Sequence, residues 1–460
     1  MNKTILFWLS LLAALTLTAV NCTPEDPDTQ KEREEETKPA DLKAMKLTLD
    51  PVGDGIFDSS PQFSLKIENP NDVAVTEILK VVYKKDTKEV VATEEQAIEI
   101  PSNGLTMQIN AKAGLNPGFY RASFMVGSAS RGSVFGISPT KIVSAPDTVP
   151  GFNAFWNAAK AELTEVGLHF ELTEITSRSS DARKIYLVEL KSIPDTAGKE
   201  PIIVRGYYAE PQDGKKHPVI MHFYGYDDQK PTSIADCPYG GYSAEFAEFY
   251  LSTRGQMVNN RKASKRVPDG KGDFVNTYGD WFAYNFGHRD NYYYRGAFMD
   301  CVQAIRFMAS RPTSDMNNLF AEGSSQGGAL SYAAASLSDY PFTAIAPCVA
   351  FLGDFPDYFK IAGWPASTAK ANQGSMTDAE MYEFLSYFDT KNLVTRIPAS
   401  TAVIACSGLL DETCPPHTNL APFNNLITTD KVYYFYPKMQ HSIPGDWNNK
   451  ITAFFEARIK

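Results

Sequence analysis

Cysteine and histidine are both scarce in this chain, with six of each among its 460 residues. After Cys22 the cysteines form no Cys-x-x-Cys pair, and no His-x-x-x-His grouping occurs, so the spacing does not support a metal site. Cys301, Cys348 and Cys406 lie in apolar runs and are expected to be buried free thiols. In an exported protein the alternative is an oxidised pair such as Cys406 and Cys414.

An excess of positive charge is also missing. The formal net charge is -10, and residues 23–41 account for -5 of it, because eight acidic side chains there face three basic ones. No basic stripe for a phosphate backbone is found elsewhere, which argues against nucleic acid as a partner. With 43% hydrophobic and 21% charged residues, the composition is that of a folded globular protein.

The one apolar run near the N-terminus is too short for a membrane span. Lys3 precedes residues 5–20, which carry no charge and have the length of a signal-peptide core. Residues 17–22 resemble a degenerate bacterial lipobox ending at Cys22, although Asn21 fits the pattern poorly and a free or simply cleaved cysteine is the alternative. Residues 1–22 therefore predict export, with lipid anchoring in the cell envelope (periplasm or outer surface) or otherwise a periplasmic location. Residues 23–41 would be a solvated acidic tether, and the lipid would be the only contact with a membrane.

Residues 42–145 alternate between apolar and polar side chains. Phe63, Leu65 and Ile67 are separated by polar residues, and similar short runs recur up to residue 143 with turn residues between them. This pattern predicts a small immunoglobulin-like β-sandwich. It carries no recognisable chemistry, so a spacer is favoured over a sugar-binding module.

Residues 146–460 predict a second domain. Pro146 and Pro150 bracket a linker, and apolar residues from Phe152 to Leu163 follow at helical spacing. Strands are expected near 184–190, 202–208, 218–224, 248–253, 319–321, 343–349, 401–407 and 431–436, with a helix at 293–309 and a last helix at the C-terminus. Such alternation indicates a mostly parallel sheet with helices on both faces.

The candidate nucleophile is Ser325. It lies in Gly323-Ser324-Ser325-Gln326-Gly327, between a short apolar run and an alanine-rich stretch of helical character, which is the strand, turn, helix context of a G-x-S-x-G elbow. The glycines leave room where a strained turn brings strand and helix together.

Asp411 and His441 are the candidate acid and base. Each follows a predicted strand, and the order Ser, Asp, His is that of the α/β-hydrolase fold. His417 is the competing base, but it lies six residues after Asp411 in the same loop, and one loop rarely supplies both groups.

At this point residues 146–460 resemble the acetyl xylan esterases and cephalosporin C deacetylases grouped as carbohydrate esterase family seven. The resemblance rests on separated motifs: Pro150-Gly151-Phe152, Tyr224-Gly225-Tyr226, Arg254-Gly255-Gln256, Tyr292-Tyr293-Tyr294-Arg295, Gly323 to Gly328, Leu385-Ser386-Tyr387-Phe388-Asp389, and Gly408 to Asp411 running to Cys414-Pro415-Pro416.

The resemblance implies that Ser325, Asp411 and His441 are the catalytic residues and that the backbone N–H groups of Tyr226 and Gln326 form the oxyanion hole. It implies no cofactor. For Arg254-Gly255-Gln256 a structural clamp near the site is expected. Two positions depart from the family: Ser442 replaces a common glutamate after the histidine, and Ser324 replaces a glycine before the nucleophile. The ring-shaped hexamer usual in the family does not carry over to a chain with an extra domain, so the oligomeric state is left open.

The expected function is a serine carbohydrate esterase that removes acetyl groups from acetylated xylan, its oligosaccharides or similar small acetyl esters. Two alternatives stay open from the residues alone. One is another serine hydrolase on the same fold, such as a peptidase or a non-sugar esterase. The other is a catalytically silent glycan-binding lipoprotein, which would have no reason to keep all three catalytic residues.

Overall fold

The structure, a computed structural model, describes residues 43–460 except 112–113, 197, 227–233, 236–244, 260–266, 268 and 270–275. The predicted signal peptide, Cys22, the acidic tether and Cys237 therefore lie outside the described residues. Residues 44–460 form one compact unit. In the part of the chain that is described, no helix has the length and apolar character needed to cross a membrane.

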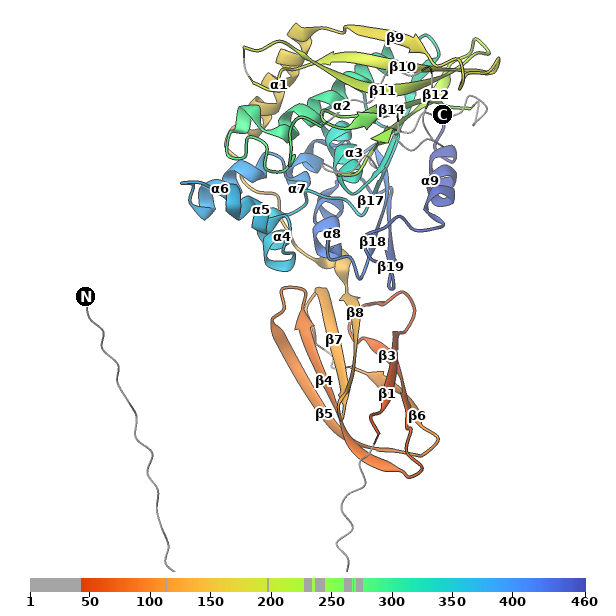
Figure 1. The fold of residues 1–460 in the computed structure, drawn as a ribbon, viewed down its shortest axis with the longest axis vertical. Coiled ribbons are helices and arrows are strands. Elements are labelled where there is room, and N and C mark those ends of the chain that lie inside the picture. Colours follow the sequence, from red (N-terminus) through yellow and green to blue (C-terminus); the bar gives the residue numbers. More distant parts are fainter. Residues whose placement is uncertain are drawn as a thin grey trace, which may run out of the picture. The chain divides into compact units, whose positions relative to one another are not determined.

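The N-terminal region is a sandwich of two sheets, as predicted (Figure 1). One sheet has three strands in the order β1 (Lys46–Pro51), β3 (Gln62–Glu68) and β6 (Leu105–Asn110). The other has five, in the order β2 (Ile56–Phe57), β8 (Ala129–Ile137), β7 (Gly118–Val126), β4 (Val75–Lys85) and β5 (Val90–Ile100). Phe63, Leu65 and Ile67 are fully buried between the sheets, because every second side chain of a strand points to the same face.

The C-terminal region is built on a nine-stranded sheet in the order β19-β18-β17-β16-β12-β14-β11-β10-β9. The neighbours from β14 to β19 are parallel, and those from β9 to β14 are antiparallel. The strands are β9 (Phe170–Glu174), β10 (Arg183–Ser192), β11 (Ile202–Pro211), β12 (His217–Phe223), β14 (Ala247–Ser252), β16 (Ser314–Ser324), β17 (Ala344–Cys348), β18 (Ala402–Gly408) and β19 (Lys431–Tyr436). A further short pair joins β13 (Ile234–Ala235) to β15 (Met257–Val258).

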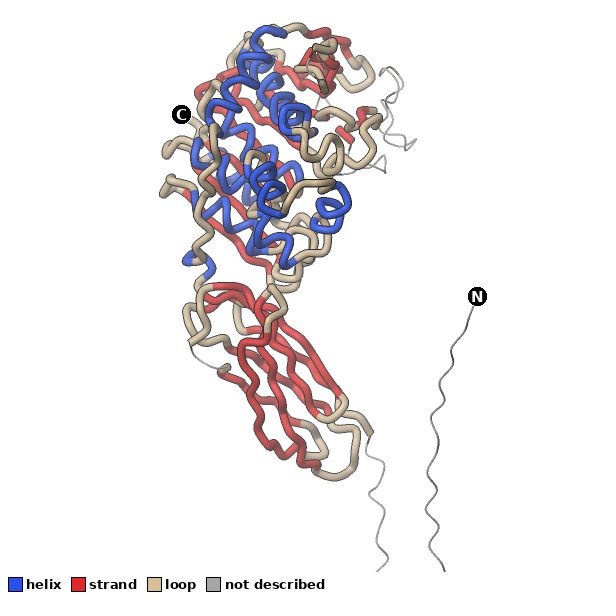
Figure 2. The backbone as a smooth tube through the Cα atoms, turned by 90° about the vertical axis from the view of Figure 1, so that its left-hand side faces the viewer, coloured by secondary structure: helices blue, strands red, loops and turns tan. Residues whose placement is uncertain are grey.

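Helices pack on both faces of this sheet (Figures 1 and 2). The central strand β16 shows how: Leu319 and Ala321 join the core beneath α2 and α3, whereas Phe320 points the other way and stacks on Phe455 of α9. The main helices are α1 (Phe152–Val166), α2 (Tyr293–Ala309), α3 (Gln326–Leu337), α8 (Pro416–Asn425) and α9 (Trp447–Glu456). The predicted α/β-hydrolase architecture is confirmed, and helix 293–309 has the predicted bounds.

Shorter helices fill the stretch between β17 and β18. They are α4 (Phe355–Ile361), α5 (Ala366–Asn372), α6 (Asp378–Ser386), α7 (Thr390–Leu393) and the 3-10 turn η3 (Val394–Arg396), and two more 3-10 turns are η1 (Pro139–Lys141) and η2 (Arg289–Asn291). The capping box of α6, in which Thr377 and Glu380 bond each other's backbone N–H, explains where that helix begins.

The segment that joins the two regions is held along α8. Asn424 Nδ2 donates to the carbonyls of Pro139 and Ile142 at 3.2 and 3.1 Å, and Asn425 Nδ2 donates to Ser144 O at 2.7 Å. These bonds satisfy backbone carbonyls that have no strand neighbour. The residues that lead into the predicted linker are thus attached to the C-terminal region.

Candidate active site

Ser325 lies at a sharp turn between β16 and α3, with φ 58° and ψ -120°. A non-glycine residue rarely adopts positive φ, and such strain persists only where the surroundings enforce it. The backbone around it supplies that enforcement: Ser325 N donates to Cys348 O at 2.9 Å, and Phe351 N donates to Ser325 O at 3.0 Å. The turn presents the Ser325 hydroxyl at the carboxyl edge of the parallel strands.

The flanking glycines are required by space. A Cβ on Gly323 would lie 2.5 Å from the backbone of Gly327, and one on Gly327 would lie 2.2 Å from Phe223 O. The space is less restricted at Gly328, where a Cβ would lie 3.0 Å from the side chain of Ala350. Strand β12, strand β16 and helix α3 can therefore meet at this turn only if the first two positions lack side chains.

The structure brings Ser325, His441 and Asp411 together. His441 Nε2 lies 3.0 Å from Ser325 Oγ, and His441 Nδ1 lies 2.8 Å from Asp411 Oδ2. The other oxygen of Asp411 accepts from the N–H groups of Thr413 and Cys414 at 2.9 and 2.8 Å. These two donors fix the carboxylate, whose side chain is fully buried, and the carboxylate in turn fixes the imidazole.

Tyr226 and Gln326 lie beside the candidate nucleophile. Gln326 is the first residue of α3, so its N–H has no acceptor within the helix. A Cβ built on Gly225 would lie 3.8 Å from Ser325 Cβ, which brings the backbone that leads into Tyr226 against the serine. Both N–H groups thus come from segments that border the Ser325 side chain.

Gln256 holds the segment before Tyr226 in place. The sequence predicts a structural clamp here but not its contacts. Its Nε2 donates to Gly225 O at 2.9 Å, and its Oε1 accepts from Thr253 N at 3.0 Å. Arg254 anchors the same turn, because its guanidinium bonds Asp300 at 2.7 and 3.0 Å and Asp195 at 2.8 Å. The Arg254-Gly255-Gln256 motif therefore ties the candidate oxyanion segment to helix α2.

Two consecutive tyrosines of α2 extend this clamp. Tyr293 Oη donates to Arg254 O at 2.8 Å, and Tyr294 Oη donates to the Oε1 of Gln326 at 3.0 Å. Gly296 lets α2 come this close, since a Cβ there would lie 1.9 Å from the Arg254 guanidinium. Motifs far apart in the sequence thus converge behind the candidate oxyanion hole.

His417, the competing base, points elsewhere. Its Nε2 lies 3.2 Å from Asp357 and 3.4 Å from Asp354, and its Nδ1 lies 3.4 Å from Asp86 of the sandwich. Contacts with Asp354, Asp357 and Asp86 outweigh burial and raise its pKa to about 11. Asp354, Asp357 and His417 are near enough to one another to hold a metal ion. The imidazolium already supplies a cation at that place, so no metal is needed to balance the carboxylates.

The cysteines correct one prediction. Cys406 faces Cys348 on the adjacent strand, with the two Sγ atoms 3.4 Å apart, and not Cys414. Cys301, Cys348, Cys406 and Cys414 are all buried free thiols, as predicted for the first three. Cys414 lies in the loop that carries Asp411, and its Sγ contacts Tyr358 Oη at 3.5 Å instead of Cys406.

His222 of strand β12 lies in a partly buried ionic network. Its two nitrogens lie 2.7 Å from Glu322 Oε1 and 2.9 Å from Glu248 Oε2, and its ring stacks on Tyr250 at 4.2 Å. The two carboxylates overcome burial and raise the pKa of His222 to about 9. This network could not be predicted from the sequence, because its members come from three strands.

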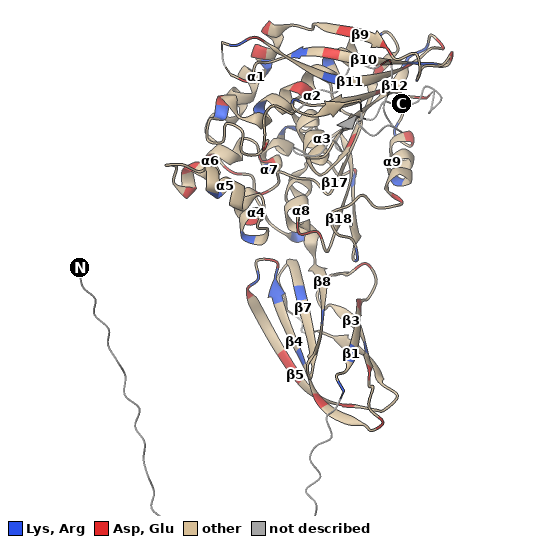
Figure 3. Ribbon diagram, in the orientation of Figure 1, with Lys and Arg blue, Asp and Glu red and all other residues tan. Residues whose placement is uncertain are grey.

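The sandwich contacts the loops that carry both Asp411 and His441. Arg121 lies 3.4 Å from Glu412, next to the acid, and Asp50 lies 2.7 Å from Lys438 in the loop of the base. A Cβ on Gly55 would lie 3.0 Å from Leu409 and 3.6 Å from Pro437, so the backbone there packs on both loops. In Figure 3 the acidic and basic residues are interspersed along the ribbon of both regions.

Comparison with known proteins agrees with this geometry. The family described as acetyl xylan esterase (AXE1) matches residues 143–458. An acetyl esterase of Xylanibacter ruminicola, Axe7A, is 26% identical over 341 residues, which are 71% of each chain.

Two solved structures are similar in fold. An acetyl xylan esterase from Paenibacillus sp. R4 has a TM-score of 0.55 and 25% identity, covering 70% of this chain and 98% of its own. Acetyl xylan esterase 1 from Thermoanaerobacterium sp. JW/SL YS485 has a TM-score of 0.55 and 23% identity, covering 70% and 96%. The family match falls on the C-terminal region.

Proposed function

Because the chain belongs to the acetyl xylan esterase family, we propose that it removes O-acetyl groups from acetylated xylan, its oligosaccharides or similar small acetyl esters, with Ser325, His441 and Asp411 as catalytic residues. The enzyme is a carboxylic ester hydrolase of this family. The observation that carries the proposal is the chain of contacts from Ser325 Oγ through His441 to Asp411, at 3.0 and 2.8 Å.

The first half of the reaction forms an acetyl-enzyme. A serine hydroxyl is a weak nucleophile at its ordinary pKa, so His441 Nε2 takes its proton while Oγ attacks the acetyl carbonyl. Asp411 holds Nδ1 protonated and stabilises the imidazolium that forms. His441 then passes the proton to the departing sugar hydroxyl.

Negative charge develops on the carbonyl oxygen during this attack. The N–H groups of Tyr226 and Gln326 are the proposed donors, and Gln256 and Tyr294 keep their segments in place. One donor of this kind typically lowers the barrier by about 3 kcal/mol. In the second half, water replaces the sugar hydroxyl, His441 again accepts a proton, and acetate leaves.

Release of acetate from acetylated xylo-oligosaccharide tests the proposal, with p-nitrophenyl acetate and a peptide as comparison substrates. We expect hydrolysis of both esters and none of the peptide. Hydrolysis of the peptide would favour a serine peptidase, and no hydrolysis at all would favour a glycan-binding protein.

The N-terminal segment belongs to the same proposal. Export and acylation of Cys22 would place the enzyme at the cell envelope, where acetylated polysaccharide fragments arrive from outside. The support is the apolar run at residues 5–20 and the position of Cys22 after it. Mass spectrometry of the mature N-terminus distinguishes a lipid-modified Cys22 from an unmodified one.

A further inference from the structure

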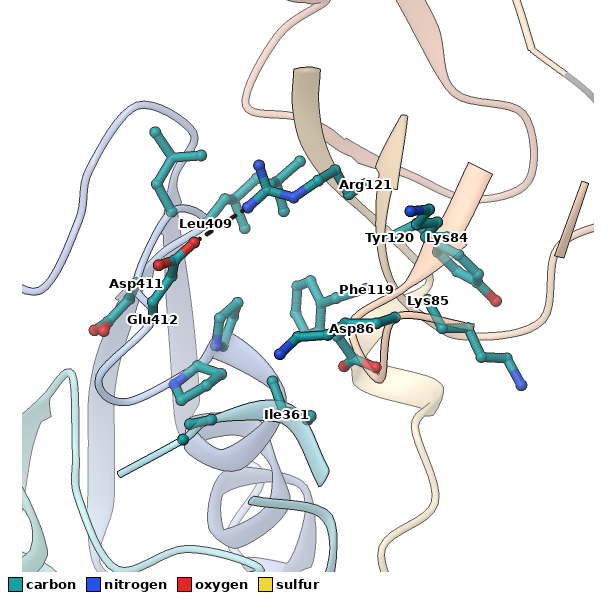
Figure 4. A pocket seen from close by; sticks show the side chains of 17 residues that line it. Lys84, Lys85, Asp86, Phe119, Tyr120, Arg121, Ile361, Leu409, Asp411 and Glu412 are labelled. Atoms are coloured by element: carbon teal, nitrogen blue, oxygen red, sulfur yellow. Dashed lines mark hydrogen bonds and ion pairs between the residues drawn. The ribbon is translucent and has the colours of Figure 1, made fainter. Parts of the chain in front are cut away.

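A cavity of about 300 Å³ lies between the sandwich and the loop after β18 that carries Asp411 (Figure 4). One wall is the turn between β4 and β5 with the neighbouring strand β7, and the other is formed by residues 409–412 and 415–416 with residues 361–363. Nothing in the proposed deacetylation uses this cavity, although Asp411 itself is one of its lining residues.

The lining is apolar on one side. Phe119 lies at the centre of the view, and Ile361 and Leu409 are close by (Figure 4). Val134, Leu410, Pro415 and Pro416 complete this surface. A wall of this kind accepts the C–H face of a sugar ring, whereas a small inorganic anion would gain nothing from it.

The other side is cationic. Lys84, Lys85, Lys88 and Arg121 all line the cavity. Among the described residues, Lys85 pairs with Glu89 at 3.6 Å, and no ion pair is found for Lys84 or Lys88. The acidic lining residues are already engaged: Asp411 with His441, Asp86 with the His417 imidazolium, and Glu412 with Arg121.

A ligand carboxylate could replace Glu412 as the partner of Arg121. The Arg121–Glu412 pair is a single contact of 3.4 Å between side chains that are 49% and 86% exposed, and Figure 4 shows it at the edge of the cavity. Exposed pairs of this kind contribute little stability. A carboxylate that accepts two N–H bonds from the guanidinium would form a better contact than Glu412 does.

We propose that this cavity binds a uronic acid residue of the acetylated glycan, with the sugar ring against the apolar lining and the carboxylate among Lys84, Lys88 and Arg121. The volume is sufficient for one sugar ring with its substituent. This inference rests on the proposed function, since it concerns the same glycan. It assigns the sandwich a share in substrate selection.

Binding is tested first, on the full chain. The probes are methyl glucuronoside, methyl xyloside as its neutral counterpart, and inorganic phosphate, followed by calorimetry or ligand-observed NMR. We expect the glucuronoside to bind at least about tenfold more tightly than the xyloside and the phosphate, with affinity that falls as salt is added. Equal binding of glucuronoside and xyloside, or of glucuronoside and phosphate, would overturn the proposal.

A matched pair of variants locates the site. Lys84→Gln with Lys88→Gln should weaken glucuronoside binding by about tenfold, because both uncompensated ammonium groups are lost. Lys66→Gln with Lys80→Gln also removes two positive charges from the sandwich, at lysines that pair with Glu68 and Glu95 and do not line the cavity, and should change nothing. If the two variants behave alike, the glucuronoside binds elsewhere.

Kinetics then separates this proposal from the function on which it rests. Acetylated xylo-oligosaccharides with and without a uronic acid branch are compared, and the acidic one should have the lower KM. The ratio of kcat/KM for acidic over neutral substrate should fall toward one in the Lys84→Gln, Lys88→Gln variant. A ratio of one in the wild type overturns the cavity proposal while deacetylation stands. Failure to deacetylate either substrate, with glucuronoside still bound, overturns only the function.

Discussion

In the proposed mechanism, the reactivity of Ser325 depends on neighbours from two other loops. The strained turn presents the hydroxyl, His441 would accept its proton, and the buried Asp411 would orient the imidazole. Ser325→Ala should therefore lower acetyl ester hydrolysis by about 10⁴-fold or more, with a small residual rate from the oxyanion donors. The melting temperature should stay within a few degrees of wild type, because the side chain fills no core space. A folded variant with activity within tenfold of wild type would refute the assignment.

The identity of the base gives a second prediction. His441→Ala should lose nearly as much activity as Ser325→Ala, and the double variant should be little worse, because the three residues act as one unit. His417→Ala should retain far more activity. A histidine whose pKa is about 11 carries its proton at neutral pH and cannot accept another from Ser325. Greater loss from His417→Ala than from His441→Ala would show that the base is misassigned.

Gln256 should act on the reaction without touching substrate. Gln256→Met keeps the volume but removes the donor to Gly225 O, so the segment that carries Tyr226 loses its clamp. We expect kcat to fall by about 10- to 100-fold with little change in KM, since the lost contact supports transition-state charge. Gln373→Met is the control, because that glutamine is also buried but bonds only the turn before α6. Equal effects of both substitutions would indicate general destabilisation.

At the scale of elements, the sequence predicts what is local. Alternation of apolar residues and turn signals predicted most strand bounds of the C-terminal sheet to within a few residues, although β9 was missed and β16 is longer than expected, and helix 293–309 began and ended as expected. The order Ser, Asp, His led to three residues that the structure brings together. Contacts between elements could not be predicted, because they depend on strand order and register. His222 reaches Glu322 only because β12 pairs with β16 at that position, and Cys348 meets Cys406 for the same reason.

The His222 network should make stability depend on pH. The pKa of His222 rises from an ordinary value of 6.5 to about 9 in the folded chain, so folding favours its protonated form. This contribution is fully present below pH 6.5 and is lost as pH rises through about 9. Urea midpoints at pH 6, 7.5 and 9.5 should therefore decline, and less steeply in His222→Gln. His288→Gln, at an exposed histidine, is the control. An unchanged slope in His222→Gln would exclude the network as the cause.

At the scale of the whole molecule, we propose that the sandwich supports the candidate site in addition to acting as a spacer. It contacts the loops of both Asp411 and His441, and the uronic acid proposal adds a wall of a cavity. We therefore expect the chain from residue 146 onward to hydrolyse p-nitrophenyl acetate with a kcat at least about tenfold lower than the full chain, because both loops lose support.

A full-length variant also tests whether the sandwich supports the two loops, and it keeps the hydrophobic cores of both regions. Asp50→Asn with Arg121→Gln breaks the two ion pairs to the loops and should lower kcat in the same direction by a smaller factor. Full activity of a folded 146–460 chain would restore the spacer interpretation.

The packing of the sandwich on these loops also has a consequence for the order in which the enzyme matures. The sandwich leaves the ribosome, or an export channel, before any residue of the C-terminal sheet, whereas the loop of His441 and helix α9 come last. When that loop is synthesised, the part of the sandwich on which it packs, at Gly55 and Asp50, has already been made. Until the segment after β19 has been synthesised, the nascent chain therefore lacks the proposed base, and we expect it to hydrolyse no ester before that point.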